Sequence, residues 1–343
     1  MIRRLLTISI ALMVCSFILI NYTIVNSEQV CSAKVLVVDV SNVSIGYTNI
    51  SDAIVDADQG DVIYVNPGFY FESLFIDKNI SVISNDSKST VINSLGNVYS
   101  VSIKSSDVVL SGFTITNSTI GVYISGSDDI LSNNIIINNT NAIYLENSSE
   151  RNNILDNSIG DNVEAISLYN SSFNTILENK FFNNTLFGIK IRESSTNNII
   201  EKNTFNRSAK AIILGRWSNF NMIYNNSFSS EKFKGLGIVL EYSYYNFIYS
   251  NVFSNCIYGL YLYNTHNNTI KNNTFENNDF GVYKKNSDEQ NLTEHNYFNE
   301  NGEDVKSFVN PPSIKIPSSE LTVLIVAVFI LLILFFALPK KKN

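Results

Sequence analysis

The chain has 343 residues, with 24 Lys and Arg against 31 Asp and Glu, a formal net charge of −7 and only two His. An acidic chain of this kind lacks the basic face that phosphate binding requires, so we expect no nucleic-acid partner. The 50 Asn residues and the scarcity of Pro disfavour both a helical protein and a proline-rich stalk.

The first 27 residues are predicted to be a secretory signal peptide. Two arginines precede an apolar run from Leu5 to Ile20, and Val25 and Ser27 satisfy the small-residue rule for cleavage before Glu28. An uncleaved membrane anchor is the alternative. After cleavage only two cysteines remain, too few for a disulfide-dense secreted module, so we expect Cys31 and Cys256 to be free thiols.

A short helix is predicted at residues 49–60, after an N-terminal segment at 28–45. Its apolar residues would share one face and Gly60 can end it. These apolar residues are Ile50, Ala53, Ile54 and Ala57. Because the open end of a stack of strands needs a cover, we expect this helix to act as a cap.

Residues 46–310 are dominated by a repeat of 22 to 25 residues. Each unit has an Asn two residues before an Ile or Phe, and these are Asn134, Asn157, Asn179, Asn203, Asn226, Asn251, Asn273 and Asn296. A second polar column lies five residues earlier, at Asp129, Asn152, Asn174, Asn198, Asn221, Asn246, Asn268 and Asn291. Later in each unit, a Gly or Ala begins an alternating run such as GVYI or AIYL.

Short alternating runs of Ile, Val, Tyr and Phe, separated by Asn, Ser and Gly, predict strands, and a fixed period predicts a solenoid. We therefore predict an all-β, single-stranded parallel β-helix of about ten turns with three strands in each turn. Stacked turns would place each Asn above the last. The corners need residues that tolerate left-handed backbone angles, and stacked amides can hydrogen-bond along the axis, so both Asn columns are interpreted as structural ladders.

The C-terminal end has the pattern of a membrane anchor. Residues 311–320 form a short spacer, and 321–338 form an uncharged apolar run long enough to cross a bilayer. Residues 339–343 form a basic tail, which favours the cytoplasmic side. We therefore expect a single-pass membrane protein of an archaeal or bacterial cell surface, with the β-helix outside the cell.

The segment SDAIVDADQGDVIYVNPGFYFESLFIDKNISVISND resembles the N-terminal part of many right-handed parallel β-helix proteins of pectate-lyase-like architecture. The N-x-I-x-x-N-x-F turns resemble those of the NosD-like "periplasmic copper-binding" β-helix group, which overlaps with carbohydrate-binding and sugar-hydrolysis β-helices. The resemblance covers about residues 46 to 305. It implies a β-helix fold on a cell surface and a role with either carbohydrate or copper.

The alternating strands send every second side chain outward, which gives two candidate columns for a glycan. These columns combine aromatic rings, which can stack on sugars, with charges that bind hydroxyls or carboxylates. The candidate ligand-binding residues are Tyr123, Tyr144, Glu146, Tyr169, Lys190, Arg192, Glu241, Tyr261 and Tyr263. Plain sheet surface is the competing interpretation, because Tyr also stabilises exposed strands by cross-strand contacts.

Copper sites need His, Met or Cys ligands, and the mature chain offers few. His266 and His295 are the candidates, and solvent-exposed turn histidines are the alternative interpretation. We expect neither a metal site nor any other cofactor.

Catalysis on a glycan needs paired carboxylates, or clustered acids with a base. Glu146 and Glu241 fall about four turns apart, and Asp128 and Asp129 have no third acid in their column, so the pattern does not favour an enzyme. The sequence favours a surface-anchored rod with a glycan-binding or structural and adhesive role. The alternatives are a polysaccharide lyase or glycoside hydrolase of the β-helix class and a copper accessory protein. Recurrent N-x-Ser/Thr motifs permit glycosylation.

Overall fold

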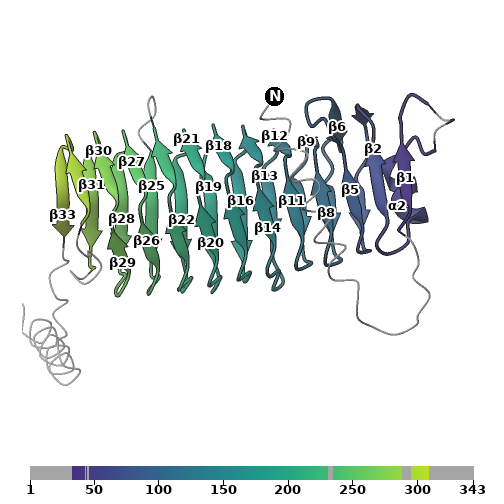
Figure 1. The fold of residues 1–343 in the computed structure, drawn as a ribbon. Coiled ribbons are helices and arrows are strands. Elements are labelled where there is room, and N and C mark those ends of the chain that lie inside the picture. Colours follow the sequence, from purple (N-terminus) through teal and green to yellow (C-terminus); the bar gives the residue numbers. More distant parts are fainter. Residues whose placement is uncertain (1–32, 43, 45, 231–234, 288–294, 309–343) are drawn as a thin grey trace, which may run out of the picture.

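The computed structural model describes residues 33–42, 44, 46–230, 235–287 and 295–308, which coil into a rod (Figure 1). Three sheets of eleven parallel strands each run the length of the rod, and each complete turn contributes one short strand to every sheet. The predicted all-β parallel β-helix is confirmed, with eleven strands in each sheet where about ten turns were expected. One complete turn of three strands is called a rung below.

The first sheet consists of β1 (Val35–Val38), β2 (Val62–Val65), β5 (Ser81–Ile83), β8 (Val109–Ser111), β11 (Ile130–Ser132), β14 (Asn153–Leu155), β17 (Thr175–Leu177), β20 (Ile199–Glu201), β23 (Met222–Tyr224), β26 (Phe247–Tyr249) and β29 (Thr269–Lys271). The second sheet consists of β3 (Gly68–Tyr70), β6 (Thr90–Asn93), β9 (Thr114–Thr116), β12 (Ile135–Ile137), β15 (Ser158–Gly160), β18 (Lys180–Phe182), β21 (Thr204–Asn206), β24 (Ser227–Ser229), β27 (Val252–Ser254), β30 (Thr274–Glu276) and β32 (Tyr297–Asn299).

The third sheet consists of β4 (Leu74–Ile76), β7 (Tyr99–Ile103), β10 (Ile120–Ile124), β13 (Asn141–Leu145), β16 (Glu164–Tyr169), β19 (Phe187–Arg192), β22 (Lys210–Gly215), β25 (Leu236–Glu241), β28 (Tyr258–Tyr263), β31 (Phe280–Lys285) and β33 (Glu303–Phe308). Most of its strands have five or six residues, whereas most strands of the other two sheets have three. The third sheet is therefore the broadest side of the rod.

The core is a set of stacked apolar columns. The second sheet contributes a column of phenylalanines whose ring centroids lie 4.5 to 5.0 Å apart, namely Phe181, Phe205, Phe228, Phe253, Phe275 and Phe298. Small residues opposite this column are required for space. A Cβ added at Gly188 would lie 2.9 Å from the ring of Phe205, and one added at Gly237 would lie 2.6 Å from the ring of Phe253. This close approach explains the Gly or Ala in each repeat.

The Asn of the repeat are buried and hydrogen-bonded from rung to rung. Asn179 Nδ2 donates to Asn203 Oδ1 at 3.1 Å, Asn203 Nδ2 donates to Asn226 Oδ1 at 3.0 Å, and the same contact continues from Asn134 to Asn296. The second column makes equivalent contacts from Asn174 to Asn268. Each amide oxygen also accepts the backbone N–H of the preceding Asn, so the ladder satisfies buried main-chain donors as well.

The left-handed backbone angles of the corners belong to other residues. The residue just before each ladder Asn has a positive φ, as at Glu178 (57°), Lys202 (52°) and Ser250 (56°). These neighbours face outward and differ in type, whereas the ladder Asn supplies the buried amide. Amide hydrogen bonding, and not backbone tolerance of the ladder residue itself, therefore accounts for the Asn at these positions.

The structure contains a third ladder that the sequence analysis does not single out. Between the second and third sheets, Asn139 donates to Asn162 and Asn162 donates to Asn184. The three ladders are five residues apart, as at Asn152, Asn157 and Asn162. Differences in rung length therefore lie in the third-sheet strand and in the corners on either side of it, as between Ser229 and Leu236.

The predicted helix is present but shorter than residues 49–60. Helix α2 (Ile50–Asp56) buries Ile50, Ala53 and Ile54 and ends before Gly60. Its two ends are held by residues that flank β4. The Glu72 carboxylate accepts the N–H groups of the first two helical residues, and Lys78 Nζ donates to carbonyls at the C-terminal end. These contacts satisfy main-chain groups that a helix leaves unpaired at its ends.

Strand β1 begins at Val35, on the N-terminal side of the expected boundary at residue 46, and pairs in register with β2. The signal peptide (1–27), Cys31, the spacer (311–320), the apolar run (321–338) and the basic tail (339–343) lie outside the described residues. Within the described residues, no helix has the length and apolar character needed to span a membrane.

Candidate functional site

The strand register places the candidate residues in two columns on the outer face of the third sheet, hereafter the third-sheet face. The first column runs through Tyr123, Tyr144, Ser167, Lys190, Ile213, Val239, Tyr261 and Tyr283. The second runs through Tyr169, Arg192, Gly215, Glu241 and Tyr263, and Glu146 continues it on the rung before Tyr169. The face therefore joins the candidates into one surface that extends over several rungs.

One end of the third-sheet face is a ridge of tyrosines. The ring centroids of Tyr99 and Tyr123 lie 5.1 Å apart, those of Tyr123 and Tyr144 lie 6.4 Å apart, and those of Tyr144 and Tyr169 lie 5.4 Å apart. The Tyr123 hydroxyl donates to Glu146 at 2.9 Å. Tyr123 is buried in this ridge, whereas Tyr99 is exposed and Tyr144 and Tyr169 are partly exposed. Burial, together with the charge of Glu146, raises the pKa of Tyr144 to about 12, so its hydroxyl stays protonated at neutral pH.

Charged residues occupy the middle of the face. Lys190 Nζ lies 2.9 Å from Glu164, and both side chains are only 15 % exposed. Burial alone lowers the Lys190 pKa, but hydrogen bonds to Tyr169 and Glu164 outweigh it, and the pKa is raised. One column over, Arg192 reaches Glu241 at 3.7 Å across Gly215, which has no side chain to block the contact.

The middle of the first column is less open than the strand alternation suggests. Ile213 and Val239 are buried and pack with Phe187 into a small second core, against which Leu236 and Tyr261 also lie. Phe187 begins β19 and pairs with Lys210 at the start of the next third-sheet strand. Residues at the starts of the strands therefore cover Ile213 and Val239, and this part of the first column supplies packing.

The other end of the face is a second aromatic group. The Tyr258 ring lies 5.4 Å from that of Tyr261 and 4.9 Å from that of Tyr283. Tyr263 lies beneath Lys285, whose Nζ is 5.4 Å from the ring centroid. Aromatic rings with adjacent cations therefore occur at both ends of the third-sheet face.

Trp217 lies at the corner that borders the face, and the sequence analysis does not identify it. It is the single Trp of the chain, is 62 % exposed, and adopts a left-handed φ of 63°. Corner residues of neighbouring rungs, such as Ser194 (61°) and Tyr242 (51°), also have a left-handed φ, so this conformation belongs to the repeat. Its backbone N–H donates to Tyr242 on the next rung, and Tyr242 is itself exposed. The single Trp in an outward corner was the sequence signal that could have revealed this site.

The carboxylates that could serve catalysis are separated or already paired. Glu146 and Glu241 lie four rungs apart, and Glu193 is held at a corner by Arg216. Asp128 pairs with Arg151 on the surface, whereas its neighbour Asp129 is buried. Burial raises the pKa of Asp129 to about 7. These acids share no common site on the third-sheet face.

The residues that could bind copper are also apart. His266 precedes β29 at the corner between the third and first sheets and stacks on Tyr244, whereas His295 precedes β32 at a different corner. Met222 begins β23 of the first sheet, two rungs before the rung that carries His266. Cys256 is a buried free thiol. Across residues 33–42, 44, 46–230, 235–287 and 295–308, no group of three or more His, Cys, Asp or Glu is placed to hold a metal ion, so this part of the chain does not fit a copper site.

The family model described as "Periplasmic copper-binding protein (NosD)" matches residues 40–235, more than half of the chain. The chain belongs to the NosD family. A second model, for the right-handed β-helix region, matches residues 188–310, so this NosD-family rod is a right-handed solenoid. The family description is periplasmic, which agrees with a location beyond the cytoplasmic membrane. No curated protein matches the sequence.

Several solved structures share this fold. An alginate lyase from Paenibacillus sp. superposes with a TM-score of 0.54 at 14 % identity, over 81 % of this chain and 99 % of the lyase. PfbA, a surface adhesin of Streptococcus pneumoniae, gives 0.53 at 14 % identity over 78 % and 91 %. The A-module of the Azotobacter vinelandii mannuronan C-5 epimerase AlgE6 gives 0.53 at 14 % identity over 77 % and 94 %. At this level of identity, the likeness establishes the fold alone.

Proposed function

We propose that this NosD-family chain is a cell-surface rod that binds glycan chains along the third-sheet face, held at the membrane by residues 321–338. The observation that carries the proposal is the continuous row of tyrosines that ends at the Lys190 and Arg192 cations. A row with one outward side chain every rung, roughly 4.8 Å apart, is matched to a ligand that is itself extended and repetitive. Proteins titled as a lyase, an epimerase and an adhesin use the same fold, which makes a glycan a reasonable ligand class.

The chemistry of the face suits binding better than bond cleavage. Tyrosine hydroxyls at the ridge can exchange hydrogen bonds with sugar hydroxyls, and Trp217 offers an exposed ring at the bordering corner. Glu164 and Glu241 are each engaged by a cation on the same face, so they orient side chains and do not form a catalytic pair. The function therefore proposed is adhesion to, or organisation of, envelope polysaccharide.

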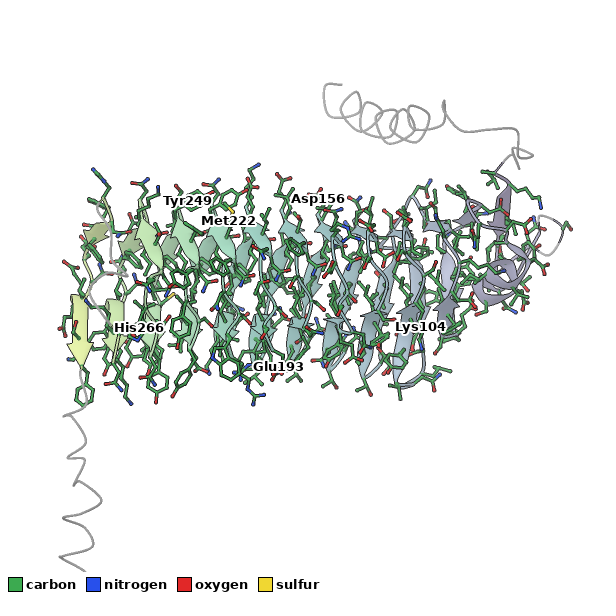
Figure 2. All side chains as sticks on the ribbon, turned by 90° about the horizontal axis from the view of Figure 1, so that it is seen from below. Lys104, Asp156, Glu193, Met222, Tyr249 and His266 are labelled. Carbon is green, nitrogen blue, oxygen red and sulfur yellow. The ribbon has the colours of Figure 1, made fainter. Side chains whose placement is uncertain are left out.

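The test is retention of the purified full-length chain on immobilised polysaccharides, with alginate and pectate as acidic polymers and dextran as a neutral one. We expect the protein to bind at least one of them, and Tyr144→Ala and Trp217→Ala to weaken that binding. Tyr249→Ala is the matched control, because Tyr249 is also partly exposed and stacked but lies on the first sheet, on a different side of the rod (Figure 2). Failure to bind any polymer, or equal losses in all three variants, would refute the proposal.

A further inference from the structure

The third Asn ladder is interrupted in the middle of the rod. Asn184 closes the run that starts at Asn139, and the next rung has Ser208 where the ladder pattern calls for an Asn. The corner geometry is otherwise conserved, because Arg207 has a φ of 60° where Asn183 has 53°. Among the described residues, the next contact of this ladder is the Cys256 N–H, which donates to Asn278. Serine is shorter than asparagine and cannot span the distance to the amide below it.

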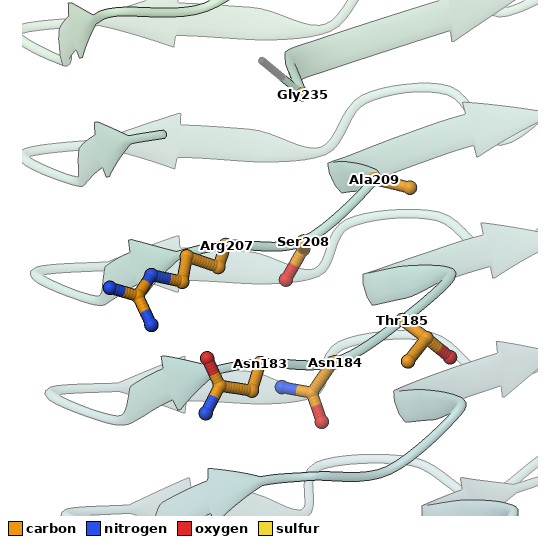
Figure 3. A pocket seen from close by; sticks show the side chains of 7 residues that line it. All are labelled: Asn183, Asn184, Thr185, Arg207, Ser208, Ala209 and Gly235. Atoms are coloured by element: carbon orange, nitrogen blue, oxygen red, sulfur yellow. The ribbon is translucent and has the colours of Figure 1, made fainter. Parts of the chain in front are cut away.

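A cavity of about 420 Å³ lies at this interruption, lined by Asn183, Asn184, Thr185, Arg207, Ser208 and Ala209 (Figure 3). It is located between the ends of the second-sheet strands β18 and β21 and the starts of the third-sheet strands β19 and β22. Figure 3 shows the Arg207 guanidinium on the rung next to Asn183, and the Ser208 hydroxyl directed toward the rung that carries Asn184. The volume is within the range of small-molecule sites, about 300–1,000 Å³.

Several polar groups around this cavity lack partners within the described part of the chain. Ser208 is 7 % exposed and its Oγ makes no hydrogen bond, and the same holds for the buried Nε of Arg207. The backbone N–H of Asn184, which would donate to the next ladder amide, also has no partner among the described residues. Buried unpaired donors cost about 1–3 kcal/mol each, so a native protein that keeps several around one cavity is suited to a ligand that accepts hydrogen bonds.

The unpaired groups define the chemistry of that ligand. An arginine, a hydroxyl and a main-chain N–H border a cavity whose described lining contains no carboxylate. Lys210 follows directly after Ala209 and adds a second positive charge nearby. The Asn183 side chain is already occupied, since its Nδ2 donates to Asp161 on the preceding rung. Guanidinium groups pair with carboxylates through two parallel hydrogen bonds, which a hydroxyl and an N–H can extend.

We propose that this cavity binds the carboxylate group of a small hydroxylated acid, such as a uronate unit. The carboxylate would accept hydrogen bonds from Arg207 and the Asn184 N–H, and Ser208 would bond to a carboxylate oxygen or a ring hydroxyl. The site is separate from the third-sheet face, because its residues belong to the corner before that sheet. A monomer could occupy the cavity even if the face bound no polymer.

The test is calorimetric titration of the full-length chain with sodium galacturonate, and with galactose as the neutral counterpart of the same ring. We expect galacturonate to bind and galactose not to bind. Arg207→Gln should weaken galacturonate binding about tenfold or more, because a charge-assisted hydrogen bond contributes about 1.5–3 kcal/mol. Arg151→Gln is the matched control, because Arg151 is an exposed arginine at another corner and should leave binding unchanged.

Ser208→Asn provides a second variant that should fold well. The new amide would accept from Asn184 and continue the ladder, so we expect galacturonate binding to be lost while thermal stability is kept or raised. Acetate and polygalacturonate distinguish the possible sources of the bound carboxylate. Binding of acetate supports a site for a simple carboxylate, and binding of polygalacturonate supports a site for a uronate unit within a chain. Equal affinity for galactose and galacturonate, no binding of galacturonate, or full affinity in Arg207→Gln would overturn the proposal.

Discussion

Replacement of Asn203 by Ala tests whether the buried amides hold the rungs together. Asn203 Nδ2 donates to Ile176 O at 2.8 Å and to Asn226 Oδ1 at 3.0 Å, and Asn203 Oδ1 accepts from Asn179 N at 2.9 Å and from Asn179 Nδ2 at 3.1 Å. The variant leaves the buried Asn179 N–H and the Ile176 carbonyl without these partners. At about 1–3 kcal/mol for each such group, we expect a loss of about 2–6 kcal/mol in unfolding free energy.

The matched control is Asn206→Ala, because Asn206 is three residues away, is exposed, and makes no side-chain hydrogen bond within the described residues. Its effect should stay within about 0.5 kcal/mol, as for ordinary surface changes. Urea unfolding followed by circular dichroism measures both variants, and hydrogen exchange at the Asn179 amide reports the local loss directly. If the two variants had the same midpoint and the Asn179 amide kept its protection, the ladder would not stabilise the rod.

Two further predictions concern buried titratable groups. Burial raises the folded-state pKa of Asp129 to about 7 from an ordinary 3.8, so its contribution to stability is present below about pH 4 and is lost as the pH rises to about 7. Asp129→Asn should therefore raise the melting temperature at pH 8 and make the melting temperature less dependent on pH. An unchanged pH profile in the variant would contradict the assignment. Burial raises the pKa of the Cys256 thiol to about 12, so the thiol should not react with iodoacetamide at pH 8 in the native protein. Peptide mapping should find Cys256 modified only after denaturation. Rapid modification of the native protein would show that the thiol is accessible.

The fold could be predicted from sequence because its main signal is periodic. An Asn two residues before a Phe fixes a buried amide and an inward ring, and repetition at 22 to 25 residues fixes the stacking. The strand register follows from the same alignment, which is why Tyr123, Tyr144 and Lys190 occur in one column. The geometry of one repeat and its contact with the next repeat are sufficient to predict the fold, because every rung makes the same contacts with its neighbours.

The details of the site could not be predicted in the same way. The cover over Ile213 and Val239 depends on which bulky side chains, such as Phe187 and Leu236, begin the third-sheet strands, and alternation alone does not predict this packing. The cavity at Ser208 depends on the side-chain amide that Ser208 lacks and Asn184 has. The size of the cavity depends on the lining residues, which do not fill the space. The cavity arises where the sequence departs from its own repeat.

The fixed spacing of the three ladders makes each rung an exchangeable unit. Removing or duplicating the stretch from one ladder Asn to the next, such as Asn179 to Asn203, would leave every amide in phase with a partner on both sides. Recombination within the gene could therefore change the length of the rod without redesigning its cross-section. Insertions would be accommodated at the corners on either side of the third-sheet strands, so new binding specificities can evolve there while the first two sheets keep the scaffold constant.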